Sequence, residues 1–325
     1  MALVELGVVL VAPLAIALPH VLPLHRVTPS TAATIWLSVL ALRALMAIGG
    51  ALFVFVYLPQ TGLYSAVVEW CWHEALPMLS THLGLSAHPL LHAAIILPGL
   101  ALAVSIVWLL FGLTRGWLLL RARLRHAIGE GPLGSTVIED DNIVVGVTGL
   151  GRGRIVVSRA ALRAMDPDEM QASLNHELGH MRRRHRPVLL LASLLAALGR
   201  LLPGTAAAEA GLRFSLERDA DEYAVRATRD PLALASAICK AATGGRLAGA
   251  TSLSGSSVTR RLDHLEGQIA PAGRRLERAI RVVAAVLLVT ALALAATVPS
   301  WALAVPKSEH TLSATGDDCP HHDAG

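Results

Sequence analysis

The residues best suited to chemistry form the pattern His-Glu-x-x-His at positions 176–180. On an α-helix, positions four apart share one face, so His176 and His180 can direct their imidazole nitrogens at one Zn²⁺ ion. Glu177 lies beside them and can act as the general base that takes a proton from the attacking water. The pattern is short enough to arise by chance, so its interpretation depends on the elements that position it.

The segment before the motif has the features of a helix start. Asp166 suits the N-cap, Pro167 suits the first helical position and Glu169 occupies the third. We therefore predict a helix over about 167–184 that carries both histidines on one face.

A catalytic zinc ion needs a third protein ligand and an open position for water. Glu217 is the best candidate, and it shares a helix face with Asp221. That spacing suits a ligand at 217 and a carboxylate at 221 that orients a ligand imidazole. Asp221 is the main alternative ligand, followed by Asp219 and Glu222. The opposing interpretation is a solvated acidic helix face.

The oxyanion of a peptidase reaction needs a further donor. Tyr223 and His264 are weak candidates for that role. A β-branched run at 143–147, glycines at 149, 151 and 153, and a second run at 154–158 predict a hairpin. By analogy with zincins, the 143–157 hairpin is a candidate to hold extended substrate by β-strand addition.

The composition indicates a membrane protein. Of 325 residues, 54% are hydrophobic and 16% are charged, and the mean hydropathy is +0.54. Such a chain is too apolar for an ordinary soluble domain and indicates several membrane spans. Arginines at the span ends account for the net charge of +4, so no direct nucleic-acid partner is expected. Three cysteines without a CxxC pattern argue against a cysteine-zinc module.

Four apolar segments each reach the ~20 residues that cross a bilayer as a helix. They are 3–24, 31–58, 92–113 and 279–302. Arginines follow the third segment and precede the fourth, whereas 59–91 contains no Lys or Arg. By the positive-inside rule, the N-terminus and the C-terminal tail lie outside and the motif lies in the cytoplasm. A fifth apolar run, 188–202, is shorter and is expected to be a core, interfacial or half-inserted helix.

These segments predict a mainly α, polytopic membrane protein with four transmembrane helices. A small α+β domain that carries the His-Glu-x-x-His motif is inserted between helices 3 and 4. The expected parts are three transmembrane helices in 1–114 with an external loop at 59–91, a cytoplasmic zinc metallopeptidase domain in 115–278, a fourth transmembrane helix in 279–303, and a short extracytoplasmic tail in 304–325.

Local patterns add detail to these parts. A third β-branched run occupies 136–138, and Ser158 is expected to cap a short helix over 159–165. The chain beyond that point is expected to be helical. Cys71 and Cys319 are both predicted outside, where a disulfide between them can form.

The motif, the arginines at 182–184, the apolar helix and Glu217-x-x-Ala-Asp221 together resemble the BlaR1/MecR1-type membrane metallopeptidases of family M56. Placement of the domain after three spans favours that resemblance. The Ste24/HtpX group of family M48 shares the HExxH…ExxxD arrangement and is the nearest alternative.

The resemblance implies that the inserted α+β domain is zincin-like (gluzincin). It also implies a zinc metalloendopeptidase (EC 3.4.24 type) with one Zn²⁺ per chain. His176, His180 and Glu217 would be the ligands, Glu177 the general base and Asp221 a supporting carboxylate. His185 stands where relatives often carry Asp and is not expected to be a ligand.

The M56 resemblance further implies signal transduction by cleavage of a transcriptional repressor of the BlaI type. The tail has no Ser-x-x-Lys motif, so direct β-lactam sensing is not expected. The M48 alternative implies quality control of membrane proteins, and a non-catalytic signalling scaffold is a third hypothesis. The expected partners are a protein substrate, the lipid bilayer and a second copy of the chain in a homodimer.

Overall fold

A computed structural model describes residue 17 and residues 19–52, 88–125, 127–148, 153–244, 253–267 and 273–303. Most of the first apolar segment, nearly all of the expected external loop and the tail lie outside this described part. The predicted disulfide between Cys71 and Cys319 also lies outside it. The first span, the external loop, the tail and this disulfide therefore stay predictions.

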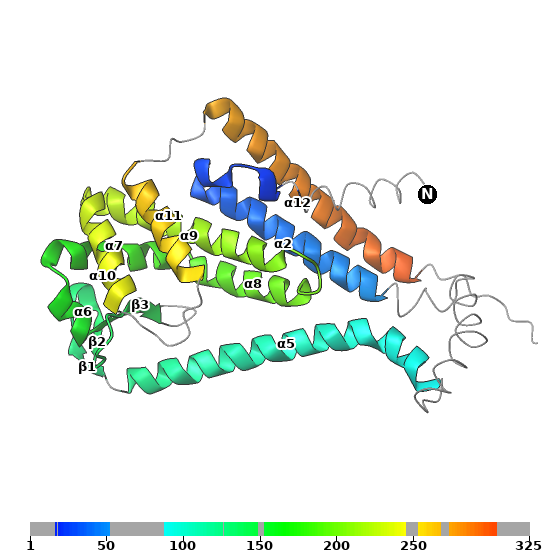
Figure 1. Ribbon diagram of the computed structural model, residues 1–325, viewed down its shortest axis with the longest axis horizontal. Coiled ribbons are helices and arrows are strands. Elements are labelled where there is room, and N and C mark those ends of the chain that lie inside the picture. The colour runs from blue at the N-terminus through cyan, green and yellow to red at the C-terminus, as the bar shows by residue number, and fades with distance from the viewer. Residues whose placement is uncertain are drawn as a thin grey trace, which may run out of the picture.

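One end of the elongated molecule is a helical bundle arranged around α2 (Pro29–Leu52), as Figure 1 shows. The short helix η1 (Leu24–Arg26) precedes α2. Three helices pack on α2: α8 (His185–Leu198), α9 (Thr205–Thr228) and α12 (Arg274–Leu303). Apolar side chains from all four helices form one buried cluster, in which Ile35 of α2 and Leu212 of α9 are fully buried.

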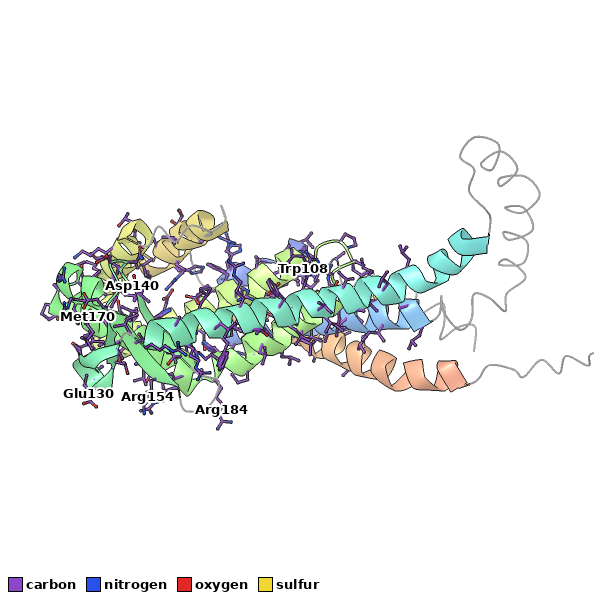
Figure 2. The ribbon with its side chains drawn as sticks, turned by 90° about the horizontal axis from the view of Figure 1, so that it is seen from below. Trp108, Glu130, Asp140, Arg154, Met170 and Arg184 are labelled. Atoms are coloured by element: carbon purple, nitrogen blue, oxygen red, sulfur yellow. The ribbon has the colours of Figure 1, made fainter. Side chains whose placement is uncertain are left out.

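The long helix α5 (His88–Leu124) lies along one side of this bundle and contacts α8. Figure 2 shows how far α5 extends beside the other helices. Its apolar side chains face outward, and Val107 and Trp108 are 63% and 62% exposed. So large an exposed apolar surface is unfavourable in water and fits contact with lipid.

Two described helices are long and apolar enough to cross a membrane, Pro29–Leu52 and Gly99–Leu119. Together with the exposed face of α5, they support a membrane protein. The predicted count of four spans is not confirmed. The residues of the expected fourth span do lie within α12, and those of the second and third lie in α2 and α5 as far as these are described.

The opposite end of the molecule holds a small sheet of β1 (Ala127–Glu130), β2 (Thr136–Ile138), β3 (Val145–Thr148) and β4 (Arg154–Ser158), in the order β1-β2-β4-β3. The predicted hairpin is present, because β3 pairs antiparallel with β4. Strand β2 pairs parallel with β4, and β1 pairs antiparallel with β2. Strand β1 was not predicted, since its residues are all exposed and show no alternation of apolar and polar side chains. The short helix η5 (Pro132–Gly134) connects β1 to β2.

Four shorter helices complete this end: α6 (Arg159–Ala164), α7 (Pro167–Arg182), α10 (Pro231–Gly244) and α11 (Leu253–Leu265). The predicted cap of α6 is present, because the Ser158 hydroxyl accepts from the Ala161 amide at 3.0 Å. Helix α7 ends two residues earlier than predicted. Arg184 has φ 54°, a left-handed conformation, and this turn separates α7 from α8.

The fifth apolar run forms α8 and then a tight turn into α9. This turn lies against Arg43 in the middle of α2: a Cβ on Gly199 would lie 3.1 Å from the Arg43 Cβ. The Arg43 guanidinium donates to the Pro203 carbonyl and lies 3.0 Å from His20 Nε2. Further along α9, Arg218 donates to the Val27 carbonyl at 3.1 Å. The α8–α9 turn therefore lies beside the middle of α2. The three alternatives for the fifth apolar run, a core, interfacial or half-inserted helix, stay predictions.

Candidate metal centre

Helix α7 is held at its start by a capping box. The Asp166 carboxylate accepts from the Asp168 and Glu169 amides, and the Glu169 carboxylate accepts from the Asp166 amide at 2.9 Å. Burial raises the pKa of Glu169, but hydrogen bonds from Lys240, Ser236 and the Asp166 amide, with the Lys240 charge, outweigh it and lower that pKa. Because Lys240 and Ser236 belong to α10, the first turn of α7 is tied to a neighbouring helix.

Helix α7 packs closely on α9 in the middle of the motif. A Cβ on Gly179 would lie 3.1 Å from the Tyr223 Cβ and 3.3 Å from the Ala220 Cα. A side chain at 179 would meet α9 more tightly than ordinary van der Waals contact, so its neighbours on α9 would have to shift. The glycine thus allows the histidines of α7 to meet the carboxylates of α9.

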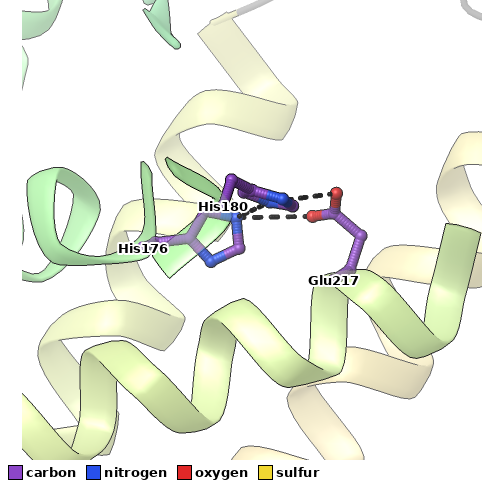
Figure 3. A group of neighbouring side chains, drawn as sticks. All are labelled: His176, His180 and Glu217. Atoms are coloured by element: carbon purple, nitrogen blue, oxygen red, sulfur yellow. Dashed lines mark hydrogen bonds and ion pairs between the residues drawn. The ribbon is translucent and has the colours of Figure 1, made fainter. Parts of the chain in front are cut away.

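Three side chains from these two helices form a candidate metal site (Figure 3). One ligand atom from each of His176, His180 and Glu217 lies within 4.8 Å of the others. The two Nε2 atoms are 3.2 Å apart. Glu217 Oε2 is 3.4 Å from His176 Nε2, and Glu217 Oε1 is 3.4 Å from His180 Nε2. The predicted ligand set therefore converges on one point.

Asp221 lies behind His176, where the sequence spacing predicted it. Its Oδ1 atom is 2.9 Å from His176 Nδ1. Burial lowers the pKa of His176, but hydrogen bonds to and the charges of Asp221 and Glu217 outweigh it and raise that pKa to about 10. The carboxylate at 221 thus contacts the ring nitrogen opposite the one that faces Glu217.

Arg261 of α11 binds both carboxylates, and no sequence pattern indicated it. Its guanidinium donates to Asp221 Oδ2 at 2.8 Å and Oδ1 at 2.6 Å. Its Nη1 atom is 3.0 Å from Glu217 Oε2. In the sequence Arg261 cannot be told from its neighbour Arg260, which is exposed, so only the packing of α11 on the site reveals this contact.

His180 is supported on its far side by His185 and Asp219, in roles that the sequence did not indicate. His185 Nδ1 is 2.9 Å from His180 Nδ1, and His185 Nε2 is 3.0 Å from Asp219 Oδ2. Arg183 also donates to Asp219. His185 is 3% exposed, so it belongs to the buried surroundings of the site and not to the protein surface.

Glu177 follows the first ligand histidine on α7 and is partly buried. Burial raises the pKa of its carboxyl group, while His176 and His180 lower it to a smaller extent. A carboxylate with a raised pKa is better matched to accepting and returning a proton near neutral pH. The environment therefore suits the predicted general base.

The two weak oxyanion candidates lie at different places. Tyr223 packs against Gly179, next to the ligand His180 in sequence. His264 lines a separate cavity of about 450 Å³ with Arg218 and Asp221, and burial and nearby cations lower its pKa to about 4. Neither role is tested by these positions, and His264 is not among the converging side chains of the described residues.

Comparison with known proteins indicates the class of metallopeptidases. Residues 137–216 match the model of peptidase family M48. A "Protease HtpX homolog" from Thermoplasma acidophilum is 44% identical over 45 residues, which is 14% of this chain and 14% of that relative. No solved structure matches significantly. The match supports the M48 alternative and gives no support to the M56 resemblance.

The family match contains the His-Glu-x-x-His motif but stops one residue before Glu217. The assignment of Glu217 as the third ligand therefore rests on the geometry of the site. The relative shares only a short stretch with this chain, so protease activity of this chain is a proposal and not a finding.

Proposed function

We propose that the protein is a membrane-associated, zinc-dependent endopeptidase of the M48 type. The observation that carries the proposal is the convergence of His176, His180 and Glu217 beside the partly buried Glu177. The match to peptidase family M48 supports it independently.

The side chains fit a catalytic zinc ion by their chemistry. Two imidazole nitrogens and one carboxylate are a known catalytic donor set, which leaves a further coordination position open. The opposite ring nitrogen of each histidine lies 2.9 Å from a polar atom, Asp221 Oδ1 for His176 and His185 Nδ1 for His180. Such partners orient ligand imidazoles and are typical of zinc enzymes.

The proposed chemistry assigns each group a task. Zinc, when bound, would polarise the scissile carbonyl and lower the pKa of water. The Glu177 carboxylate takes the proton of the attacking water, and the same group later returns it to the leaving amine. His176, His180 and Glu217 hold the centre in place beside it.

Strand β3 provides a candidate surface for the peptide substrate. It is at one edge of the sheet, pairs only with β4 among the described strands, and contacts α7. An extended peptide can add to such an edge through backbone hydrogen bonds. This mode recognises backbone in place of a fixed sequence, which suits an endopeptidase with varied substrates.

Two biological roles follow from the resemblances. The M48 match implies quality control of membrane proteins, and the M56 resemblance implies cleavage of a BlaI-type repressor. The comparisons favour the first role. The cytoplasmic position of the site, the homodimer and the four-span topology stay predictions from the sequence.

The test compares wild-type protein with Glu177→Gln, purified in detergent, for bound zinc and for cleavage of membrane and soluble proteins in expressing cells. We expect zinc in both proteins and cleavage by the wild type alone. Glu130→Gln, on the exposed strand β1, is the matched control and should cleave as the wild type does. A wild-type protein that takes up no zinc would exclude this function.

Fragments of many membrane proteins would support quality control. One cleaved repressor would instead support the regulatory role. Zinc in the wild type without any cleavage would favour the non-catalytic scaffold.

A further inference from the structure

His185 lies between the candidate metal site and the helical bundle arranged around α2. It is the first residue of α8, directly after the left-handed turn at Arg184. Its ring lies edge-on to that of His180, with 4.9 Å between centroids and an interplanar angle of 83°. Both of its nitrogens face polar atoms, although the side chain is buried.

The two ligand histidines obtain their carboxylate partners by different routes. His176 Nδ1 is 2.9 Å from a carboxylate oxygen of Asp221. His180 Nδ1 faces the His185 ring, and the carboxylate of Asp219 lies on the far side of that ring. All the carboxylates involved belong to α9, and His185 fills the gap between His180 and Asp219.

The positions of the hydrogens follow from this order. His180 Nε2 faces Glu217, so it is the nitrogen with the free lone pair when a metal is held there. His180 Nδ1 then carries the hydrogen and donates to His185 Nδ1. The hydrogen of the His185 ring must therefore sit on Nε2, where it donates to Asp219 Oδ2. In this series of hydrogen bonds, each nitrogen or oxygen can therefore be assigned as either donor or acceptor.

We propose that His185 and Asp219 are positioning residues that together hold the His180 ring in the orientation and tautomer that bind zinc. The proposal rests on the proposed function, since it assumes that His180 is a zinc ligand. It also makes the turn between α7 and α8 part of the site, because that turn places His185.

The test measures metal affinity in addition to activity. Purified full-length protein is stripped of metal, and the dissociation constants of Zn²⁺ and Co²⁺ are measured by competition with a chromophoric chelator. The visible absorption of bound Co²⁺ reports the coordination geometry. A side chain that only fills space should affect neither readout.

Four variants separate the contributions of the His180–His185 contact and the His185–Asp219 contact. His185→Phe keeps a buried ring and removes both nitrogens, and we expect about 10–100-fold weaker binding of zinc with an altered cobalt spectrum. His185→Asn supplies an acceptor near the Nδ1 position and should retain more affinity than His185→Phe. Asp219→Asn should weaken binding, and the double variant His185→Phe with Asp219→Asn should be no weaker than His185→Phe alone.

Two controls exclude indirect effects. Asp168→Asn removes an exposed carboxylate from the first turn of α7 and should leave the dissociation constant unchanged. Leu174→Val creates a packing defect in the same helix, and it should lower the melting temperature without changing the cobalt spectrum.

The proposal is wrong if His185→Phe binds both metals as the wild type does, or if the effects of His185→Phe and Asp219→Asn simply add. Failure of the proposed peptidase function can be told apart from failure of this proposal. In that case the wild type itself would bind no zinc or cleave no protein.

Discussion

Three carboxylates of α9 approach the two ligand histidines in different ways. Glu217 faces both Nε2 atoms, and Asp221, one helical turn later, contacts His176. This spacing follows directly from helix geometry and was predicted from the sequence. Asp219 reaches His180 only through His185, a residue at the start of another helix. Sequence reasoning ranked Asp219 as a distant alternative ligand because this intervening ring was not foreseeable.

At the same scale, Arg261 neutralises the carboxylates of Asp221 and Glu217. We expect Arg261→Met to lower the free energy of unfolding of the metal-free protein by about 1–3 kcal/mol, since the buried Asp221 carboxylate and the partly exposed Glu217 carboxylate lose their guanidinium partner. Thermal or denaturant unfolding in detergent measures this change. Arg260→Met is the control: its guanidinium lies 4.5 Å from the Phe214 ring centroid, and its loss should cost less than about 1 kcal/mol. Equal effects of the two variants would contradict the role of Arg261.

Among the elements, the contact between α7 and α9 decides whether the ligands can meet. Ala at 179 would favour the helix by about 1 kcal/mol, but its Cβ would clash with α9. Because overpacking costs about 1–3 kcal/mol, we expect Gly179→Ala to be slightly destabilising and to weaken zinc binding. Gly112→Ala on α5, where a Cβ has open space, should instead stabilise the protein slightly. Unchanged zinc affinity in Gly179→Ala would show that the close approach is not required.

The link between α7 and α10 should depend on pH. Glu169 has a lowered pKa in the folded protein, so its ion pair contributes stability above the unfolded value near 4.5 and loses it as pH falls through the folded pKa. We expect Lys240→Met to cost about 1–2 kcal/mol at pH 7, a modest value because Lys240 is 39% exposed, and the difference should shrink at acid pH. Arg226→Met, from an exposed pair, should change stability little at either pH. A pH-independent difference for Lys240→Met would contradict this assignment.

For the whole molecule, the outward face of α5 should lie in lipid. With the native cysteines replaced, we expect a spin label at Val107→Cys in liposomes to be accessible to oxygen and inaccessible to a water-soluble nickel reagent, because this position is 63% exposed on an apolar helix. The same label at Val39→Cys, which is fully buried on α2, should be protected from both reagents. Strong relaxation enhancement of the α5 spin label by the nickel reagent would place this helix in water.

The sequence by itself determined the local features of this protein. The capping box of α7, the cap of α6, the β3–β4 hairpin, the His176–His180 pair and the Glu217–Asp221 pair all depend on short spacings within one helix or one hairpin. Such spacings are set by helix and strand periodicity, so they can be recognised without knowledge of the fold. Composition likewise indicated a membrane protein, because the apolar excess is concentrated in four long segments that can be recognised without knowledge of the fold. Only the packing of α7 on α9 brings the histidine pair and the carboxylate pair together.

Only the tertiary structure decided which elements meet. The contact of Arg261 with two carboxylates, the path from His180 through His185 to Asp219, and the position of the α8–α9 turn against Arg43 join residues of separate helices. Each depends on how helices pack, and an arginine or histidine that forms such a contact has the same local sequence as one that faces solvent. The physical reason is that packing selects partners by three-dimensional fit and by the cost of leaving buried polar groups unpaired.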